Sequence, residues 1–238
     1  MPIRAWQGST IAKTERGPTM ASCMTQTIRL RPLQRLVWLT ASTLLVAGAG
    51  IWLWKAVLED RVVAKRWGVV EEGSIYRSGQ LSASLVETVL KRYHIAVIVS
   101  LTSEDPNDRA QRAELHAAAD LGIDLQRYIL SGNGTGDIQV YARVIAAIVQ
   151  AKKAGRPVLV HCATGSQRTG GVIAFYRLLV ERWPASSVYR ELRRYGWRPS
   201  DRALLEYVDR HMADLARLLV DMGVIQDVPD PLPALGRR

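Results

Sequence analysis

Cysteine and histidine are scarce in this sequence, and their scarcity removes several classes of protein. The 238 residues include two cysteines and four histidines. Cys23 and Cys162 lie on opposite sides of a long apolar run, so no disulfide framework is expected. The histidines are scattered and form no cluster with cysteine, so the sequence predicts no metal site and implies no cofactor.

Acidic residues are also few relative to basic ones. Lys and Arg total 32 against 22 Asp and Glu, which gives a formal charge of +10. Such a balance suits nucleic acid, an anionic membrane surface or an anionic substrate. The basic residues are spread along the chain without a stripe interleaved with aromatic residues, so nucleic-acid binding is not predicted.

Only one apolar run is long, the uncharged stretch at 36–54. As a helix it would measure about 28 Å, close to the hydrocarbon thickness of a bilayer. Trp38, Trp52 and Trp54 lie near its ends, where aromatic belts occur. A buried core helix and a cleaved signal peptide are the alternatives. We expect a single-pass membrane helix. The basic residues that flank it nearly balance, with a slight preference for placing the following domain outside the cytoplasm.

Composition divides the rest of the chain. We expect a disordered tail at 1–35, a charged linker at 55–68, one folded domain at 69–225 and a flexible Pro-rich tail at 226–238.

Strand and helix patterns alternate within the folded domain. Strands are expected at 73–79, 95–101, 124–130 and 157–160, and helices at 82–93, 108–121, 137–153, 169–180, 185–195 and 201–222. The predicted fold class is α/β, a central and mostly parallel sheet flanked by helices. Ligands bind such sheets beyond the carboxyl ends of the strands.

One strand end carries the segment from His161 to Gly170, HCATGSQRTG. Between the strand and the next helix the backbone must turn tightly, so several amide N–H groups converge and form an anion cradle. Arg168, six positions after Cys162, can fork onto two phosphate oxygens. Amides, helix dipole and arginine all favour the thiolate, which makes Cys162 a candidate nucleophile toward phosphorus.

The remaining residues of this segment have predicted supporting roles. His161 orients the loop, and the Thr169 hydroxyl stabilises the cysteine as a leaving group. The amides of the cradle come from the positions between cysteine and arginine, namely Ala163, Thr164, Gly165, Ser166 and Gln167.

This segment resembles the signature of the protein tyrosine phosphatases: His-Cys, five residues, then Arg-Thr-Gly. The stretch from Val70 to Leu81, with Ile-Tyr-Arg-Ser-Gly-Gln, is similar to the opening of small bacterial dual-specificity phosphatases. The resemblance covers roughly 69–200. It implies a phosphatase-like fold that hydrolyses phosphotyrosine or related esters through a phosphocysteine intermediate, with a phosphorylated protein or a small phosphate ester as substrate.

The family also implies an Asp general acid about thirty residues before the cysteine. The matching stretch, 131–133, has no carboxylate. Asp137 is the first substitute, although it can equally be a helix cap. Glu104 and Asp105 follow another strand, and a solvated turn explains them as well. An acid is needed because an alkoxide or aryloxide leaves poorly unless it is protonated.

Three other functions stay open at this stage. The missing acid fits a pseudophosphatase that binds phosphorylated partners without turnover. Phosphoinositide or inositol phosphate phosphatases are similar in sequence but often have lysines inside the loop. A rhodanese-like sulfurtransferase also uses a loop cysteine, but the Arg-Thr-Gly ending argues against it.

Overall fold

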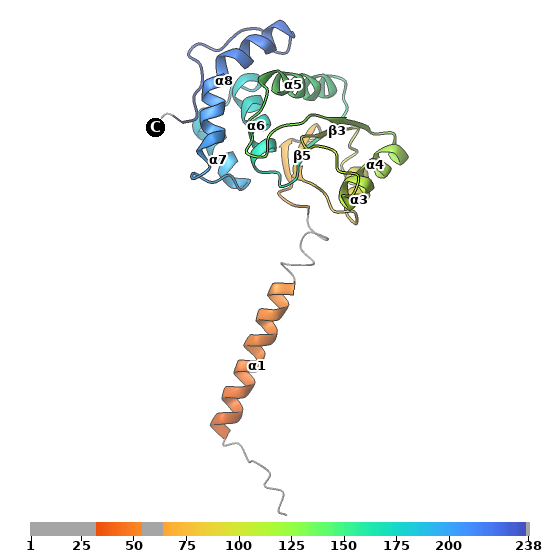
Figure 1. Cartoon of the computed structure of the whole chain (residues 1–238), viewed down its shortest axis with the longest axis vertical. Coiled ribbons are helices and arrows are strands. Elements are labelled where there is room, and N and C mark those ends of the chain that lie inside the picture. Colours follow the sequence, from red (N-terminus) through yellow and green to blue (C-terminus); the bar gives the residue numbers. More distant parts are fainter. Residues whose placement is uncertain (1–31, 54–63, 237–238) are drawn as a thin grey trace, which may run out of the picture. The chain divides into compact units, whose positions relative to one another are not determined.

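The computed structural model describes residues 32–53 and 64–236. The first described segment is helix α1, Pro32–Leu53, which has 22 residues (Figure 1). The hydroxyls of Thr40, Ser42 and Thr43 donate hydrogen bonds to backbone carbonyls of the preceding turn. These bonds satisfy the hydroxyl groups within the helix itself.

The membrane anchor expected at 36–54 is not supported by the structure. A helix is present over that run as far as Leu53, but none of the helices in 32–53 and 64–236 is long and apolar enough to cross a bilayer. The side of the membrane on which the domain would lie stays an untested prediction. Most of the predicted tail at 1–35 and of the linker at 55–68 lies outside the described residues.

The second segment contains a five-stranded sheet in the order β1-β2-β5-β3-β4. β1 pairs antiparallel with β2, and every other neighbouring pair is parallel. The strands are β1 Gly68–Glu71, β2 Ile75–Gly79, β3 Val97–Ser100, β4 Asp124–Arg127 and β5 Val158–Cys162. This arrangement confirms the predicted α/β class with a mostly parallel sheet.

Side chains from the central strands alternate between two apolar clusters because successive residues of a strand point to opposite faces. Val158 and Val160 lie in the larger cluster, whereas Leu159 lies in the smaller one. Helices α5, α6, α7 and α8 cover the larger cluster, and α3 and α4 cover the smaller one (Figure 1). Both faces of β3 and β5 are therefore buried, which explains their continuous apolar runs.

Seven helical segments surround the sheet in the described part of this domain. They are α3 Val86–Arg92, α4 Arg109–Leu121, α5 Ile138–Lys153, α6 Gln167–Phe175, the π-helical turn η2 Tyr176–Val180, α7 Ala185–Arg194 and α8 Arg202–Asp221. The Asp108 side chain caps α4 by accepting hydrogen bonds from the amides of Ala110 and Gln111. Such a cap satisfies amides that lack a partner within the helix.

Besides shifts of a few residues at other element ends, the structure differs from the predicted elements in four places. β1 was not expected, and β4 stops at Arg127 instead of continuing to residue 130. The helix expected at 169–180 begins two residues earlier and ends in the π-helical turn η2. Part of the tail expected to be flexible packs onto α8, since the Asp209 carboxylate accepts hydrogen bonds from the Leu235 and Gly236 amides.

The packing predicts unequal effects for two leucine-to-alanine substitutions. Leu159→Ala should lower the free energy of unfolding by about 3 kcal/mol, because Leu159 is fully buried in the central strand. Leu115→Ala should change it by less than about 0.5 kcal/mol, since Leu115 is 54% exposed. Urea unfolding of both variants measures the difference. Equal losses would contradict the assignment of Leu159 to a well-packed cluster.

Candidate active site

The parallel strands bring the predicted functional residues to one edge of the sheet. Cys162, the last residue of β5, pairs with Gly79 at the end of β2. The end of β3 pairs with β5 and with the end of β4. The segments that follow these strands carry Arg168, Glu104, Asp105 and Asp137, so all of them start from the same edge.

The Cys162 thiol lies at the bottom of the loop that joins β5 to α6. Its side chain is 1% exposed, and the Gly165 amide donates a hydrogen bond to Sγ over 3.2 Å. Ser166 precedes α6, and its side chain makes no capping hydrogen bond. Since the first amides of a helix lack partners within the helix, those of α6 stay available to an anion above the thiol.

The surroundings of Cys162 favour its ionised form. Burial alone would raise the pKa of the thiol. The Thr169 hydroxyl and amide, the Gly165 amide and the Arg168 charge oppose burial, and together they lower the pKa of Cys162. A thiol of this kind forms the nucleophilic thiolate more readily near neutral pH than a free cysteine does.

Arg168 is the loop cation that the sequence predicts. Its Nη1 donates to the Leu101 carbonyl over 3.3 Å, at the end of β3, and its Nε is buried without a partner among the described residues. One side of the guanidinium is thus held by the sheet. The other N–H groups of a guanidinium can then bind oxygens of an anion in the loop.

Close contact with β2 shapes the loop. Gly165 has a φ of +75°, and a Cβ added there would lie 2.5 Å from the Gly79 amide nitrogen. The Gln80 amide also donates to the Ala163 carbonyl over 3.2 Å, and Arg66 donates to the Thr164 carbonyl over 2.8 Å. Only glycine fits at position 165, for steric and conformational reasons.

His161 anchors the loop from the opposite face of the sheet. Its Nε2 lies 3.0 Å from Glu114 Oε1 of α4, and both side chains are about 1% exposed. Gln80 Nε2 donates to the same carboxylate over 3.1 Å. Burial would lower the pKa of His161, but the Glu114 charge and hydrogen bond prevail and raise it. Glu114 is therefore the specific partner of His161, whose predicted role is to orient the loop.

The three predicted acid candidates occupy different places. Asp137 is exposed and caps α5, with Oδ1 accepting from the Gln139 amide over 2.9 Å. It follows the loop 131–136, and a Cβ at Gly134 of that loop would lie 2.9 Å from the Gln167 carbonyl oxygen. Glu104 and Asp105 are exposed after β3, and Asp105 accepts from the Asn107 amide in a turn. The loop before Asp137 thus lies close to the start of α6, whereas the segment that carries Glu104 and Asp105 meets the cysteine loop at Leu101.

Besides Arg66, two more residues that contact this loop were not predicted from the sequence. Gln167 Nε2 donates to Asp201 Oδ2 over 2.8 Å, which places an exposed carboxylate of the segment before α8 beside the loop. Arg77 of β2 donates to the Gly165 carbonyl over 3.0 Å from a fully buried position. The Tyr-Arg-Ser-Gly-Gln segment was noted only for its similarity to dual-specificity phosphatases, and no local pattern pointed to Asp201.

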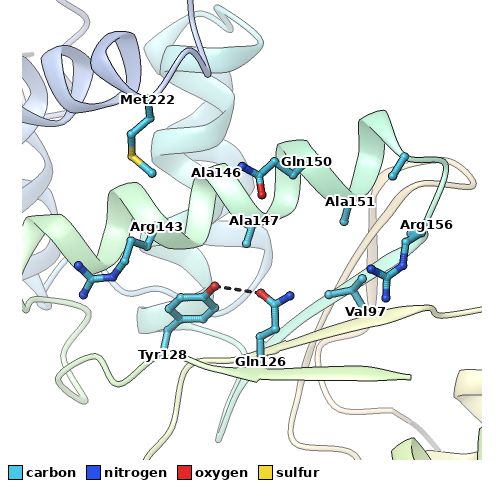
Figure 2. A pocket seen from close by; sticks show the side chains of 11 residues that line it. Val97, Gln126, Tyr128, Arg143, Ala146, Ala147, Gln150, Ala151, Arg156 and Met222 are labelled. Atoms are coloured by element: carbon cyan, nitrogen blue, oxygen red, sulfur yellow. Dashed lines mark hydrogen bonds between the residues drawn. The ribbon is translucent and has the colours of Figure 1, made fainter. Parts of the chain in front are cut away.

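A separate hollow of about 600 Å³ lies beneath α5 at the β4 edge (Figure 2). Gln126 and Tyr128 are hydrogen-bonded along its floor, and Arg143 and Arg156 stand at opposite ends. No residue of the cysteine loop lines it, so its size does not argue for the active site. No group of three or more metal-ligating side chains occurs among residues 32–53 and 64–236.

A strand-loop-helix that holds a buried cysteine thiol under an anion cradle, with an arginine six positions on, defines the class of cysteine-dependent phosphatases. The sequence model of the Tyrosine phosphatase family matches residues 61–217. The chain belongs to this family.

Curated relatives are similar over part of their length. Dual specificity protein phosphatase TpbA of Pseudomonas aeruginosa is 30% identical over 128 residues, 54% of each chain. Inositol diphosphatase SIW14 of Saccharomyces cerevisiae is 29% identical over 137 residues, which are 56% of this chain and 46% of the relative. The chain thus spans about half the length of these relatives.

Solved structures share the fold. The catalytic core of S. cerevisiae SIW14 superposes with a TM-score of 0.54 at 22% identity, covering 71% of this chain and 97% of that one. P. aeruginosa TpbA gives a TM-score of 0.51 at 24% identity, covering 68% and 99%.

The His161–Glu114 pair predicts a pH-dependent stability. Because the folded-state pKa of His161 is raised, the stabilisation is fully present below the unfolded value of about 6.5 and is lost as pH rises through the folded-state pKa. Glu114→Gln should therefore destabilise the protein by up to about 3 kcal/mol near pH 6 and by less near pH 9.

Unfolding in urea at the two pH values measures this difference. Glu87→Gln, which removes an exposed carboxylate paired with Lys91, is the matched control and should change stability little at either pH. A Glu114→Gln effect that does not shrink with rising pH would show that His161 does not gain its proton from this pairing.

Proposed function

We propose that this protein is a phosphomonoesterase that works through a phosphocysteine intermediate. The observation that carries the proposal is the buried Cys162 thiol, which receives the Gly165 amide at 3.2 Å and has a lowered pKa beneath the start of α6. A phosphoryl group in this cradle would meet the thiolate on one side, while the loop amides and Arg168 bind its oxygens.

The reaction takes place in two displacements. The Cys162 thiolate attacks phosphorus, the bond from phosphorus to the ester oxygen breaks, and that oxygen takes a proton from a general acid. Water then attacks the phosphocysteine and gives a proton to the carboxylate left by the general acid. The phosphorus–sulfur bond breaks, and inorganic phosphate leaves with the thiolate and the acid both restored. The Gly165 amide, which donates to the sulfur over 3.2 Å, and the neighbouring Thr169 groups, which lower the pKa of the thiol, stabilise the sulfur when it is released as an anion.

The loop side chains favour a substrate with a single phosphoryl group. Between cysteine and arginine the side chains are neutral: Ala163, Thr164, Ser166 and Gln167. Positions 163–167 therefore offer no positively charged side chain to the additional phosphates of a multiply charged ligand. Phosphotyrosine or a similar monoester is therefore the substrate class that we propose, in keeping with the dual-specificity name of TpbA.

The inositol diphosphatase name of SIW14 supports a second candidate substrate class. The formal charge of +10 and the Arg66 side chain, which binds the Thr164 carbonyl at the loop rim, suit a polyphosphorylated ligand. Phosphate release from an aryl phosphate, a phosphotyrosine peptide and an inositol polyphosphate, compared by kcat/KM, decides between the classes.

Activity should disappear when either half of the nucleophile–cation pair is removed. Cys162→Ser and Arg168→Ala should each lower kcat for an aryl phosphate by at least about 10³-fold, through loss of the nucleophile and of transition-state charge binding respectively. Steady-state hydrolysis of a chromogenic aryl phosphate measures both effects.

Cys23→Ser and Arg156→Ala are the matched controls, and both should hydrolyse the substrate like the natural protein. The Arg156 guanidinium donates a hydrogen bond to the Ala96 carbonyl. Arg156 precedes the start of β5, whereas Cys162 is at the other end of that strand. Turnover that survives in Cys162→Ser would overturn the phosphocysteine mechanism.

Asp137 is the general acid that we propose, because its loop contacts the Gln167 backbone through Gly134. A general acid must be protonated, so its titration produces a fall in rate as pH rises. Asp137→Asn should remove this basic limb and lower kcat for a poor leaving group by about 10²-fold or more. The pH–rate profile measures both changes.

The alternative carboxylates provide the comparison variants: Glu104→Gln, Asp105→Asn and Asp201→Asn should keep the basic limb. Loss of the limb in one of these instead would move the role to that residue. A phosphoenzyme that forms in a single turnover but does not hydrolyse would favour a pseudophosphatase.

A further inference from the structure

We propose that Arg77 is a positioning residue for the nucleophile: its buried guanidinium fixes the Gly165 peptide whose amide binds Cys162, and places a second positive charge beneath the loop. This inference rests on the proposed role of Cys162 as the nucleophile. It assigns Arg77 no contact with substrate.

Arg77 is buried where an arginine is unusual. It is a central residue of β2, is fully inaccessible to solvent, and takes part in none of the ion pairs found in residues 32–53 and 64–236. Its Nη2 donates to the Gly165 carbonyl over 3.0 Å. Its guanidinium carbon lies 3.9 Å above the centroid of the Tyr195 ring. The ring attracts a cation through its negative face.

Tyr195 reaches this position because β1 leaves room for it. A Cβ added at Gly68 would collide with the Tyr195 ring. The ring therefore lies close against the β1 backbone and supports Arg77 from the side of α7. Gly68 and the Tyr195 ring thus form a shelf that supports the Arg77 guanidinium.

Gly165 links Arg77 to Cys162 through its two backbone groups. Its carbonyl accepts from Arg77, and its amide donates to Cys162 Sγ over 3.2 Å. Its φ of +75° orients the two groups, and the β2 backbone blocks displacement on one side, since a Cβ would lie 2.7 Å from the Ser78 carbonyl carbon. Fixing the carbonyl therefore helps to keep the amide directed at sulfur.

The charge of Arg77 persists despite burial. Burial lowers its pKa to about 10, with Glu191, Tyr195 and Cys162 opposing that shift. The group is thus protonated at neutral pH. Its Nε and Nη1 have no hydrogen-bond partner among the described residues. Unmet donors on a buried cation are costly, so an apolar side chain would suit the fold better.

A second buried arginine on the same side of the sheet shows the contrast. Arg177 pairs with Glu181 and Glu191 and donates to the Val70 carbonyl. Its charge is neutralised by these two carboxylates at ion-pair distance. Arg77 also feels the charge of Glu191, but its side-chain hydrogen bond goes to the backbone of the cysteine loop.

The test measures the thiol rather than turnover. In a Cys23→Ser background, the pH dependence of alkylation by iodoacetate reports the ionisation of Cys162. Arg77→Met should move the alkylation midpoint upward by about one pH unit, because an opposite charge near the thiolate is lost. It should also lower kcat/KM for an aryl phosphate about tenfold or more while KM changes less.

Arg156→Met is the matched control, because it removes an arginine that binds a backbone carbonyl away from the loop. Its alkylation midpoint should match that of the natural protein. Arg77→Lys keeps the charge without the planar fork, so its midpoint should stay near the natural value while kcat/KM recovers only in part.

An alkylation midpoint in Arg77→Met that matches the natural protein would overturn the proposal, and so would an unchanged kcat/KM in that variant. If Arg77→Met does not fold, Tyr195→Leu decides, because it removes the shelf and should shift the midpoint in the same direction by a smaller amount. An absence of phosphatase activity in the natural protein would contradict the proposed function, whereas the alkylation midpoints would still test Arg77.

Discussion

The close approach of the cysteine loop to the end of β2 is the constraint on which the rest of the site depends. Gly165 lies so near to Gly79 and Ser78 that neither loop nor strand can shift without the other. From this contact follow the left-handed backbone at Gly165, the direction of its amide toward Cys162, and the reach of Arg77 to its carbonyl. A rigid cradle of this kind needs little reorganisation when charge develops on a bound phosphoryl group.

The two faces of the sheet support the loop through different chemistry. On the face covered by α5 to α8, Arg77 rests on Tyr195 and binds the loop backbone. On the opposite face, His161 pairs with Glu114, which also accepts from Gln80. Charged groups at these depths are costly to bury, and an apolar core would serve the fold without them. Their common contact is the cysteine loop, in keeping with the positioning role proposed for Arg77.

The acid side of the site is built differently. The acid candidates Asp137, Glu104 and Asp105, like Asp201, are exposed and lie on connecting segments. Connections at a strand edge vary more readily than the strands they join, which is why families change substrates there. The surroundings of the Cys162 thiol are therefore enclosed, whereas the side of the site that carries these carboxylates is open to solvent.

Local residue patterns were sufficient for the α/β class, the central strands and the loop from His161 to Gly170, because each depends on neighbours in the sequence. The continuous apolar runs of β3 and β5 predict burial on both faces, and the structure confirms it. The membrane anchor was the principal expectation that the structure does not support. Strand β1 escaped prediction because four residues of mixed polarity carry little periodic signal.

Tertiary structure alone decided which distant residues complete the site. Arg77 lies 88 positions from the carbonyl it binds, and Asp201 lies 34 positions from Gln167. Glu114 faces His161 only because α4 packs beneath β5. Cys162 and Arg168 are only six positions apart in the sequence, so their spacing can be recognised directly. Their supports are brought together by the order of the strands and the packing of the helices, which no local pattern encodes.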